Sequence, residues 1–532
     1  MPPQVLISEY FKSTAATLAT VAVLSLASET FAASAAQPSD NQNDAQLESR
    51  QEVTERDGVG YRVTGIQLGY RTDHPDLPDL KPLLQRTVSL IPVEGGYVGP
   101  LSAEDGRAVV EVTIGEIGLQ GVETLYGSAL AVIIQAVRDE MESRYGFLGH
   151  LVTPSLDEIA FRTTQEDLRG PGDHPLTILI WLATVGDVRT VARGDRIAEQ
   201  PGEHDDPNVN HPAHQRQRDR LTIEAGDLLT KESVDDEVYK LNRHPGRRVD
   251  VSIAPSTEQG EVVLDYLISE PKQWSAYASA SNTGTKSTNE WQERFGFIHR
   301  QLIGQDDILQ LDYITAGFDK SHAVMGSYAF DLGPDFRARV HGRWNRYTAS
   351  DVGLGFASFE GEGYEFGGEI STNIWQDGPR FLDVFGGLRY EHISVDNKVL
   401  LISGKEDFLL PFAGVRYQKS TPLHTAFAEV RFETNLASVA GTSELAIGTL
   451  GRPNVENEFT TVKGQITHSF FLEPIFDPKG FKGDRGVDDM TLAHELVFTL
   501  RGQSSLGSRL APNYQMVAGG ASSVRGYKES VA

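Results

Sequence analysis

The sequence lacks cysteine, has few positive charges for its length, and has no long apolar run within its body. With 0 cysteines in 532 residues, disulfides, thiolate metal sites and cysteine nucleophiles are excluded. The 48 Lys and Arg residues against 74 Asp and Glu residues give a net charge of −26, which argues against nucleic acid as a partner, because nucleic-acid binders need basic faces. No internal run approaches the ~20 apolar residues that a membrane-spanning helix requires.

The apolar exception lies at the N-terminus. Lys12 precedes the apolar stretch Ala15–Ala27, and two small-residue motifs, Thr30–Ala32 and Ala33–Ala35, resemble signal-peptidase sites. A buried helix is the alternative, but the polar run Gln37–Arg56 offers it no partner elements. We therefore predict a signal peptide over residues 1–35 and export of the chain.

A polar linker over 36–58 precedes the first mixed module, which we predict over 59–197. Residues 61–68 alternate like a strand, and 130–141 have the apolar spacing of a helix. Residues 176–182 and 188–192 look like two closing strands of the same module.

A second module is predicted over 219–271, after a flexible connection over 198–218 that is rich in Pro, His and Asp. Its helix covers 233–242, with acidic residues in the first turn. Its hairpin pairs 248–253 with 261–268.

From residue 272 to 532 the pattern changes to amphipathic strands of about ten residues with Gly/Asp/Asn-rich turns between them. In Phe336–Asn345 the odd positions are basic or polar, so Arg337, Arg339 and Arg343 share one face, which we predict to line a watery lumen while the apolar face meets lipid. We place about eleven strands, with boundaries good to about 3 residues. They lie near 274–283, 290–300, 306–316, 323–331, 336–346, 362–373, 380–392, 407–418, 424–435, 458–471 and 491–503. A soluble β-sandwich or propeller would also alternate, but strands of this length favour a tilted membrane crossing.

The most informative motif is the loop Gly519-Gly520-Ala521-Ser522-Ser523-Val524-Arg525-Gly526-Tyr527, which follows the last strand. With the modules, the turn Leu241–Val249 and the start of the barrel at Trp274–Thr283, it resembles the TpsB-type transporters of two-partner secretion, the haemolysin activation/secretion proteins, related to the assembly factor BamA. The resemblance implies a membrane β-barrel of the sixteen-stranded type, with about eleven strands present, preceded by two α+β POTRA-like periplasmic modules. It also implies that Val524, Arg525, Gly526 and Tyr527 form a loop folded into the lumen, with Gly519 and Gly520 at its start.

The resemblance further implies an outer-membrane location, with the modules in the periplasm. The partners would be a secreted exoprotein (TpsA-like) as substrate, the outer-membrane lipid bilayer and the barrel-assembly machinery. The modules would capture an unfolded segment by adding it to a sheet edge, and the barrel would conduct it. Three alternatives stay open: a BamA-like factor that inserts other barrels, a soluble adhesin or enzyme of the cell surface, and a non-functional truncated remnant.

The sequence shows no active site, so we expect no catalytic residue, no cofactor and no metal, and we do not expect an enzyme. Histidines and aspartates between 204 and 214 lack fixed ligand spacing, and Ser, His and Asp are scattered without a nucleophile elbow. The considered metal candidates are His204, Asp205, Asp206, His211 and His214.

The sequence stops at Ala532, whereas the family barrel has five further strands, one of which carries an aspartate that pairs with the loop arginine. Each unpaired edge of a partial barrel would leave backbone groups unsatisfied in hydrocarbon. We therefore expect that residues 1–532 alone do not insert as a functional monomer.

Overall fold

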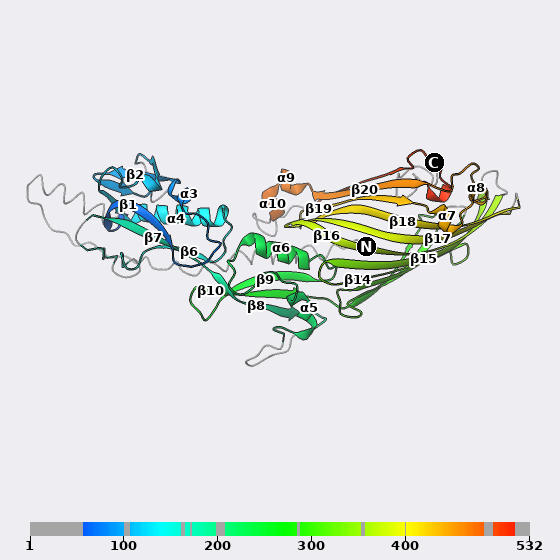
Figure 1. The fold of residues 1–532 in the computed structure, drawn as a ribbon, viewed down its shortest axis with the longest axis horizontal. Helices are drawn as coiled ribbons and strands as arrows, with labels where there is room; N and C mark the ends of the chain where they lie inside the picture. Colours follow the sequence, from blue (N-terminus) through cyan, green and yellow to red (C-terminus); the bar gives the residue numbers. More distant parts are fainter. Residues whose placement is uncertain are drawn as a thin grey trace, which may run out of the picture.

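A computed structural model describes residues 57–100, 107–160, 165–170, 173–197, 208–284, 288–352, 357–398, 401–482 and 493–516. Two small modules lie at one end of an elongated molecule, and a large sheet forms the other end (Figure 1). Within the described residues no helix is long and apolar enough to cross a membrane. The predicted signal peptide over 1–35 and most of the predicted linker lie outside the described residues.

The first module is a mixed seven-stranded sheet, in the order β4-β2-β3-β5-β1-β7-β6, covered by helix α4. Helix α4 (Gly127–Ser143) buries Leu130, Ile133, Val137 and Met141, whose spacing of three and four residues makes one apolar stripe. The helix and strand β1 fall where the sequence predicts them, whereas the short strands β2 to β6 were not predicted. The other elements are β1 (Gly60–Tyr70), α3 (Lys81–Leu84), β2 (Thr87–Val93), β3 (Gly96–Val98), β4 (Val110–Thr113), η1 (Ile114–Glu116), β5 (Glu123–Tyr126), β6 (His150–Pro154) and β7 (His174–Leu182).

The boundary of the first module differs from the prediction. Strand β8 (Thr184–Arg193) does not close the first sheet but pairs in parallel with β10 (Glu261–Ser269) of the second module. The change of sheet happens at Ala183, whose N–H donates to Gly149 O (2.9 Å), while the next N–H, of Thr184, donates to Gly260 O (3.1 Å). Apolar alternation runs through both strands, so the sequence identified two strands but not their different partners.

The second module is a three-stranded sheet, in the order β8-β10-β9, with β9 at Arg248–Pro255 and helix α6 (Lys231–Leu241) packed on it. Thr230 Oγ1 caps the helix by accepting from Ser233 N (3.2 Å). Part of the predicted flexible connection is ordered here, as η2 (Pro212–His214) and α5 (Gln215–Arg218). His214 and Gln217 are buried, and both bond to acidic groups described below.

Beyond the modules, the described chain forms one antiparallel sheet of eleven strands, each paired with the next in sequence. The eleven predicted strands are confirmed, although the four central ones are longer than predicted. The bounds are β11 (Trp274–Ser281), β12 (Gln292–Arg300), β13 (Ile308–Ala316), β14 (Ser321–Asp331), β15 (Phe336–Val352), β16 (Ala357–Asp377), β17 (Arg380–Asn397), β18 (Ile402–Ser420), β19 (His424–Thr434), β20 (Thr460–Phe471) and β21 (Glu495–Ser504).

The two faces of this sheet have opposite chemistry, as expected of a membrane β-barrel wall. On β15 and β16 large apolar side chains stand outward, and Phe336, Phe366 and Ile370 are 51%, 65% and 52% exposed. Alternate residues turn inward and form ion pairs between strands, such as Arg343 with Glu365 (3.2 Å). The sheet therefore has the membrane β-barrel fold class that the sequence predicts.

Candidate functional site

The second module is fixed to one end of the sheet by the turn that follows α6. Asn242 shapes this turn, because its amide donates to Val249 O (3.0 Å) and accepts from Val249 N (2.7 Å). The two bonds close a loop that presents Arg243, His244 and Arg247 toward the strand ends.

Arg247 forms the centre of the junction between module and sheet. Its guanidinium side chain is only 1% exposed and ion-pairs with Asp306, in the turn between β12 and β13, and with Glu270 (3.3 Å), which precedes β11. His214 Nε2 also contacts Glu270 (3.1 Å), and Gln217 donates to Asp306 (2.8 Å). A buried charge of this kind is stabilising only while all its partners are present.

The carboxyl groups at this junction are held ionised. Burial opposes ionisation of Glu270, but the hydrogen bond from His214 and the charges of Arg247 and Arg196 outweigh it and lower its pKa to about 2. Burial likewise opposes ionisation of Asp306, and the Arg247 charge and hydrogen bond outweigh it, so its pKa is lowered. Both carboxylates are therefore charged at neutral pH.

Further contacts bind the module to neighbouring turns. Arg220 pairs with Asp331 (2.7 Å) and donates to Gly333 O (2.6 Å), in the turn between β14 and β15. Arg243 pairs with Asp383 of β17 and lies over the Phe381 ring at 4.4 Å. The second module thus contacts the ends of strands β12 to β17.

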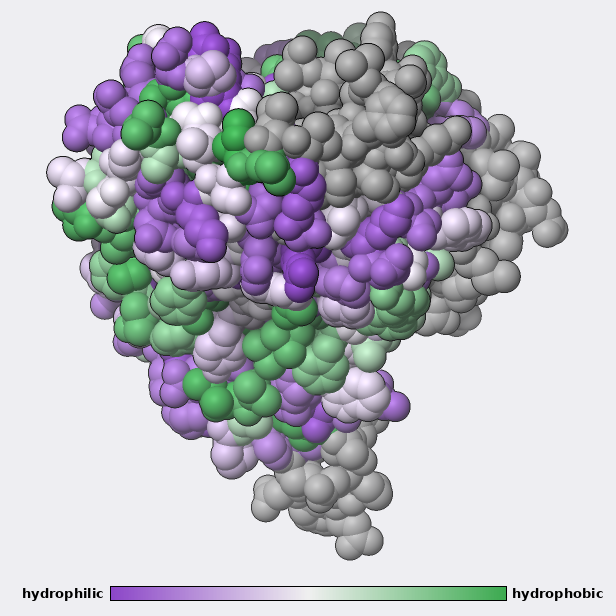
Figure 2. Space-filling model, turned by 90° about the vertical axis from the view of Figure 1, so that its right-hand side faces the viewer, coloured by the Kyte–Doolittle hydropathy of each residue, from purple (hydrophilic) through white to green (hydrophobic). Residues whose placement is uncertain are grey.

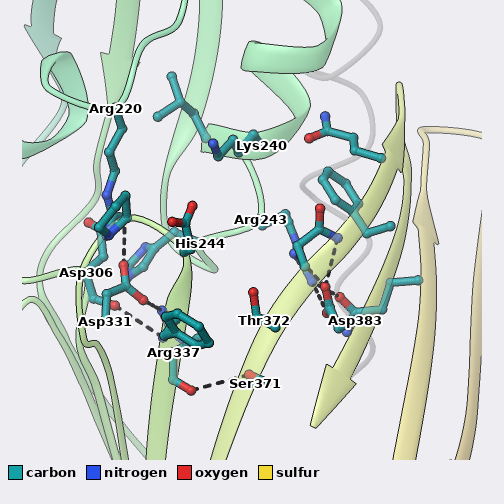
Figure 3. Close-up of a pocket in the computed structure, with 18 of the residues that line it drawn as sticks. Arg220, Lys240, Arg243, His244, Asp306, Asp331, Arg337, Ser371, Thr372 and Asp383 are labelled. Carbon is teal, nitrogen blue, oxygen red and sulfur yellow. Dashed lines mark hydrogen bonds and ion pairs between the residues drawn. The ribbon is translucent and has the colours of Figure 1, made fainter.

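Between α6 and these strand ends lies a cavity of about 410 Å³, and Figure 3 shows side chains from both parts pointing into it. From the module come Lys240, Arg243 and His244, and from the sheet come Arg337 and Asp383. The cavity therefore joins the module to the inner face of the sheet.

The three arginines predicted to face the lumen share one face of β15 but differ in their partners. Arg337 pairs with Asp331 (2.6 Å), and Arg343 pairs with Glu365 (3.2 Å) and Glu391 (2.8 Å). Arg339 is exposed and stands opposite Glu369 in the strand register, and it forms no ion pair within the described residues.

The ion pairs continue across the inner face to the last strands. Arg389 bridges Glu365 (2.7 Å) and Glu433 (2.8 Å), which also holds Lys463 of β20 (2.9 Å). Opposite charges thus alternate from β15 to β20. Charged side chains of this kind are typical of the polar inner face of a large membrane β-barrel.

At the far end of the sheet an apolar cluster lies against the inner face. Phe408 of β18 contacts Phe459 and Tyr514, with ring centroids 6.5 and 4.8 Å apart. Tyr514 also donates to Glu391 (2.9 Å). The remaining buried members come from β17, β18, the segment between β19 and β20, and the segment after β21: Ile393, Leu410, Ile447, Leu450, Val455, Leu510 and Ala511.

This far-end cluster joins two segments that sequence analysis treated as loops. One holds α7 (Ala437–Ala440) and α8 (Glu444–Gly448), and the other holds η4 (Pro512–Tyr514). Backbone bonds connect them, including Glu456 N to Arg509 O (3.1 Å). Figure 2 looks onto this end, where hydrophilic residues run across the middle of the view and hydrophobic ones gather below them.

The predicted lumen-loop residues follow the second segment. Gly519, Gly520, Val524, Arg525, Gly526 and Tyr527 lie outside the described residues. Their roles stay predictions. Of the considered metal candidates, His204, Asp205 and Asp206 are also outside, and no group of three His, Cys, Asp or Glu side chains in the described ranges could hold a metal ion.

No protein-family model matches the sequence, and no curated protein matches it. Among solved structures, CdiB from Escherichia coli is similar at a TM-score of 0.53 with 15% identity, over 92% of this chain and 79% of CdiB. CdiB from Acinetobacter baumannii gives a TM-score of 0.46 with 15% identity, over 92% of this chain and 80% of that one. The first similarity shows that this chain has the fold of the Escherichia coli protein, with modules that precede a large antiparallel sheet.

Proposed function

We propose that this chain is a TpsB-type outer-membrane transporter that exports a partner polypeptide. The modules lie in the periplasm and capture the unfolded substrate, and the inner face of the sheet conducts it. Passage needs no bond to be made or broken in the substrate, so we propose transport without catalysis.

The observation that carries this proposal is the position of the second module across one end of a charged inner wall. A conduit for an unfolded chain needs a hydrated wall, because backbone amides would lose their hydrogen bonds against an apolar one. The ion pairs of Arg343, Arg389 and Lys463 supply such a wall. The similarity in fold to CdiB from Escherichia coli also supports the proposed transport function.

Capture would use the edge of the second module. In the described chain, β9 pairs with β10 alone, so its other edge carries unpaired backbone groups. An extended segment can pair with such an edge and gain affinity from main-chain hydrogen bonds of any sequence.

The test is deletion of the gene in the source cells, followed by proteomics of the medium and of the outer membrane. We expect loss of one or a few secreted polypeptides, with the set of outer-membrane barrels unchanged. A general loss of outer-membrane barrels would instead indicate the assembly role of BamA-like proteins, and an unchanged secretome would overturn the transporter proposal.

A further inference from the structure

The cavity at the junction contains polar groups that the junction itself does not use. It lies between α6 and the ends of the central strands (Figure 3). Its volume of about 410 Å³ falls within the range of about 300–1,000 Å³ typical of ligand sites. Most of its charged side chains have partners, and the few that do not decide what it can bind.

The arginines around the cavity are neutralised. Arg220 and Arg337 share Asp331 at 2.7 and 2.6 Å, Arg243 pairs with Asp383, and Arg247 pairs with Asp306. These pairs also satisfy three of the carboxylates that line the cavity. The carboxylate of Glu237 is occupied as well, because it accepts from Ile223 N (2.8 Å) and from Tyr266.

His244 is buried without a hydrogen-bond partner. It is 7% exposed, and neither ring nitrogen bonds to any group of the described chain. An imidazole always carries at least one N–H, and leaving a buried donor unsatisfied is destabilising. A ligand in the cavity would remove that cost.

Lys240 lies in the last turn of α6, four residues before His244, and also lines the cavity. Its side chain is exposed and makes no ion pair within the described ranges. His244 lies in the turn after α6, and both side chains line the same cavity, so an ammonium group and an imidazole N–H are available to one ligand.

We propose that this cavity binds a carboxylate side chain of an extended acidic polypeptide segment, with Lys240 supplying the charge and His244 a donated hydrogen bond. The inference rests on the proposed transport function and adds a preference for acidic segments in the substrate. A polypeptide fits the place, because the cavity lies between the capturing module and the inner face of the sheet.

The partners of the cavity's carboxylates also disfavour a positively charged ligand. Glu237, Asp306, Asp331 and Asp383 already have donors, which leaves Asp335, an exposed residue of the turn between β14 and β15. The negative charge of Asp335 repels an incoming carboxylate and weakens its attraction to Lys240. Replacing Asp335 with a neutral residue should therefore strengthen binding of an acidic peptide.

The experiment uses the full chain purified in detergent and two fluorescent peptides of equal length, one of alternating Glu and Ser and one of alternating Gln and Ser. Fluorescence anisotropy measures their affinities at low salt. We expect the acidic peptide to bind about tenfold more tightly, as a charge-assisted hydrogen bond allows. Lys240→Gln should remove most of this difference, Lys240→Arg should keep it, and Asp335→Asn should enlarge it.

The control is Lys81→Gln, which removes the same charge from exposed Lys81 in the first module and should leave the difference unchanged. Because Lys240 is exposed, its substitution should not disturb folding, which circular dichroism checks. Equal binding of both peptides, or a difference that survives Lys240→Gln, would overturn the inference and leave the transporter proposal standing. If neither peptide binds, the capture step of the proposed function fails as well.

Discussion

Different kinds of interaction hold other segments of the chain against the two ends of the large sheet. At the module end, buried charges such as Arg247 and Asp306 connect two separate folding units. At the far end, Phe408, Phe459 and Tyr514 pack in an apolar cluster against the inner wall. Ion pairs depend on exact partners and on pH, whereas an apolar cluster depends on area and shape. The comparison therefore predicts that the two ends respond to different perturbations.

The largest effect should come from Arg247→Met. It leaves Asp306 and Glu270 buried without their main cation, which costs about 3–5 kcal/mol. Limited proteolysis near residue 271 and urea unfolding of the second module would measure the loss. The matched control is Arg380→Met, whose pair with Asp377 (2.8 Å) is about half exposed on both sides, and which should change stability by less than about 0.5 kcal/mol.

The far end should respond most to Phe408→Ala. Removing a fully buried ring from a packed cluster costs about 3–5 kcal/mol, but here the cost should fall on docking of the two loop segments. Hydrogen exchange should accelerate in 437–459 and 508–516 while exchange at 243–249 stays unchanged. Faster exchange at both ends would show that the ends are coupled, contrary to the comparison.

His244 should make the module end sensitive to mild acid. Burial and the Arg247 charge lower its pKa to about 4, against an ordinary value of 6.5, despite opposing contributions from Asp306 and Glu270. The unfolded chain therefore binds the proton more readily, so stability is present above pH 6.5 and is lost as the pH falls toward 4.

By pH 5 the loss at His244 should reach about 2 kcal/mol. Urea unfolding of the second module at pH 7 and pH 5 would measure it, and His244→Gln should flatten this part of the profile. A profile that keeps its slope in the variant would assign the effect to other groups. The far-end cluster should not change over this range.

The smallest effect should come from Tyr514→Phe, which removes only the hydroxyl that donates to Glu391 (2.9 Å). Loss of this bond should cost about 1.5 kcal/mol, the low end for a hydrogen bond to a charged group, because Glu391 keeps its ion pairs with Arg343 and Arg389. Ring packing against Phe408 remains, so exchange at 508–516 should rise less than in Phe408→Ala. An equal rise would mean that the hydroxyl, not the ring, holds this segment.

The sequence was most informative where one residue period repeats over a long stretch. Alternation in Phe336–Asn345 and its neighbours located all eleven strands and placed Arg337, Arg339 and Arg343 on one face of β15, because side-chain direction in a strand follows directly from position. Contacts between residues far apart in the sequence produce no repeating pattern that would predict them. Arg247 and Asp306 are 59 residues apart, and nothing local marks either as the partner of the other.

The same limit explains the misplaced module boundary and the missed far-end cluster. Strand β8 has the alternation of any strand, so its partner β10 could not be read from it. Tyr514 lies in a segment without period and Phe459 at the start of the predicted strand 458–471, and the burial of both depends on Phe408 from another strand. The roles predicted for Val524 to Tyr527 depend on resemblance to a family and remain to be tested.

The passage of the chain from β7 to β8 through the single residue Ala183 has a mechanical consequence (Figure 1). A pull on the first module reaches β8 along its own axis. Strand β8 lies parallel to β10 over Thr184–Arg193, so the load is shared by many backbone hydrogen bonds at once rather than breaking them singly. A pull on the first module would therefore be transmitted through the second module to the ion pairs, such as Arg247 with Asp306, that hold it to the sheet.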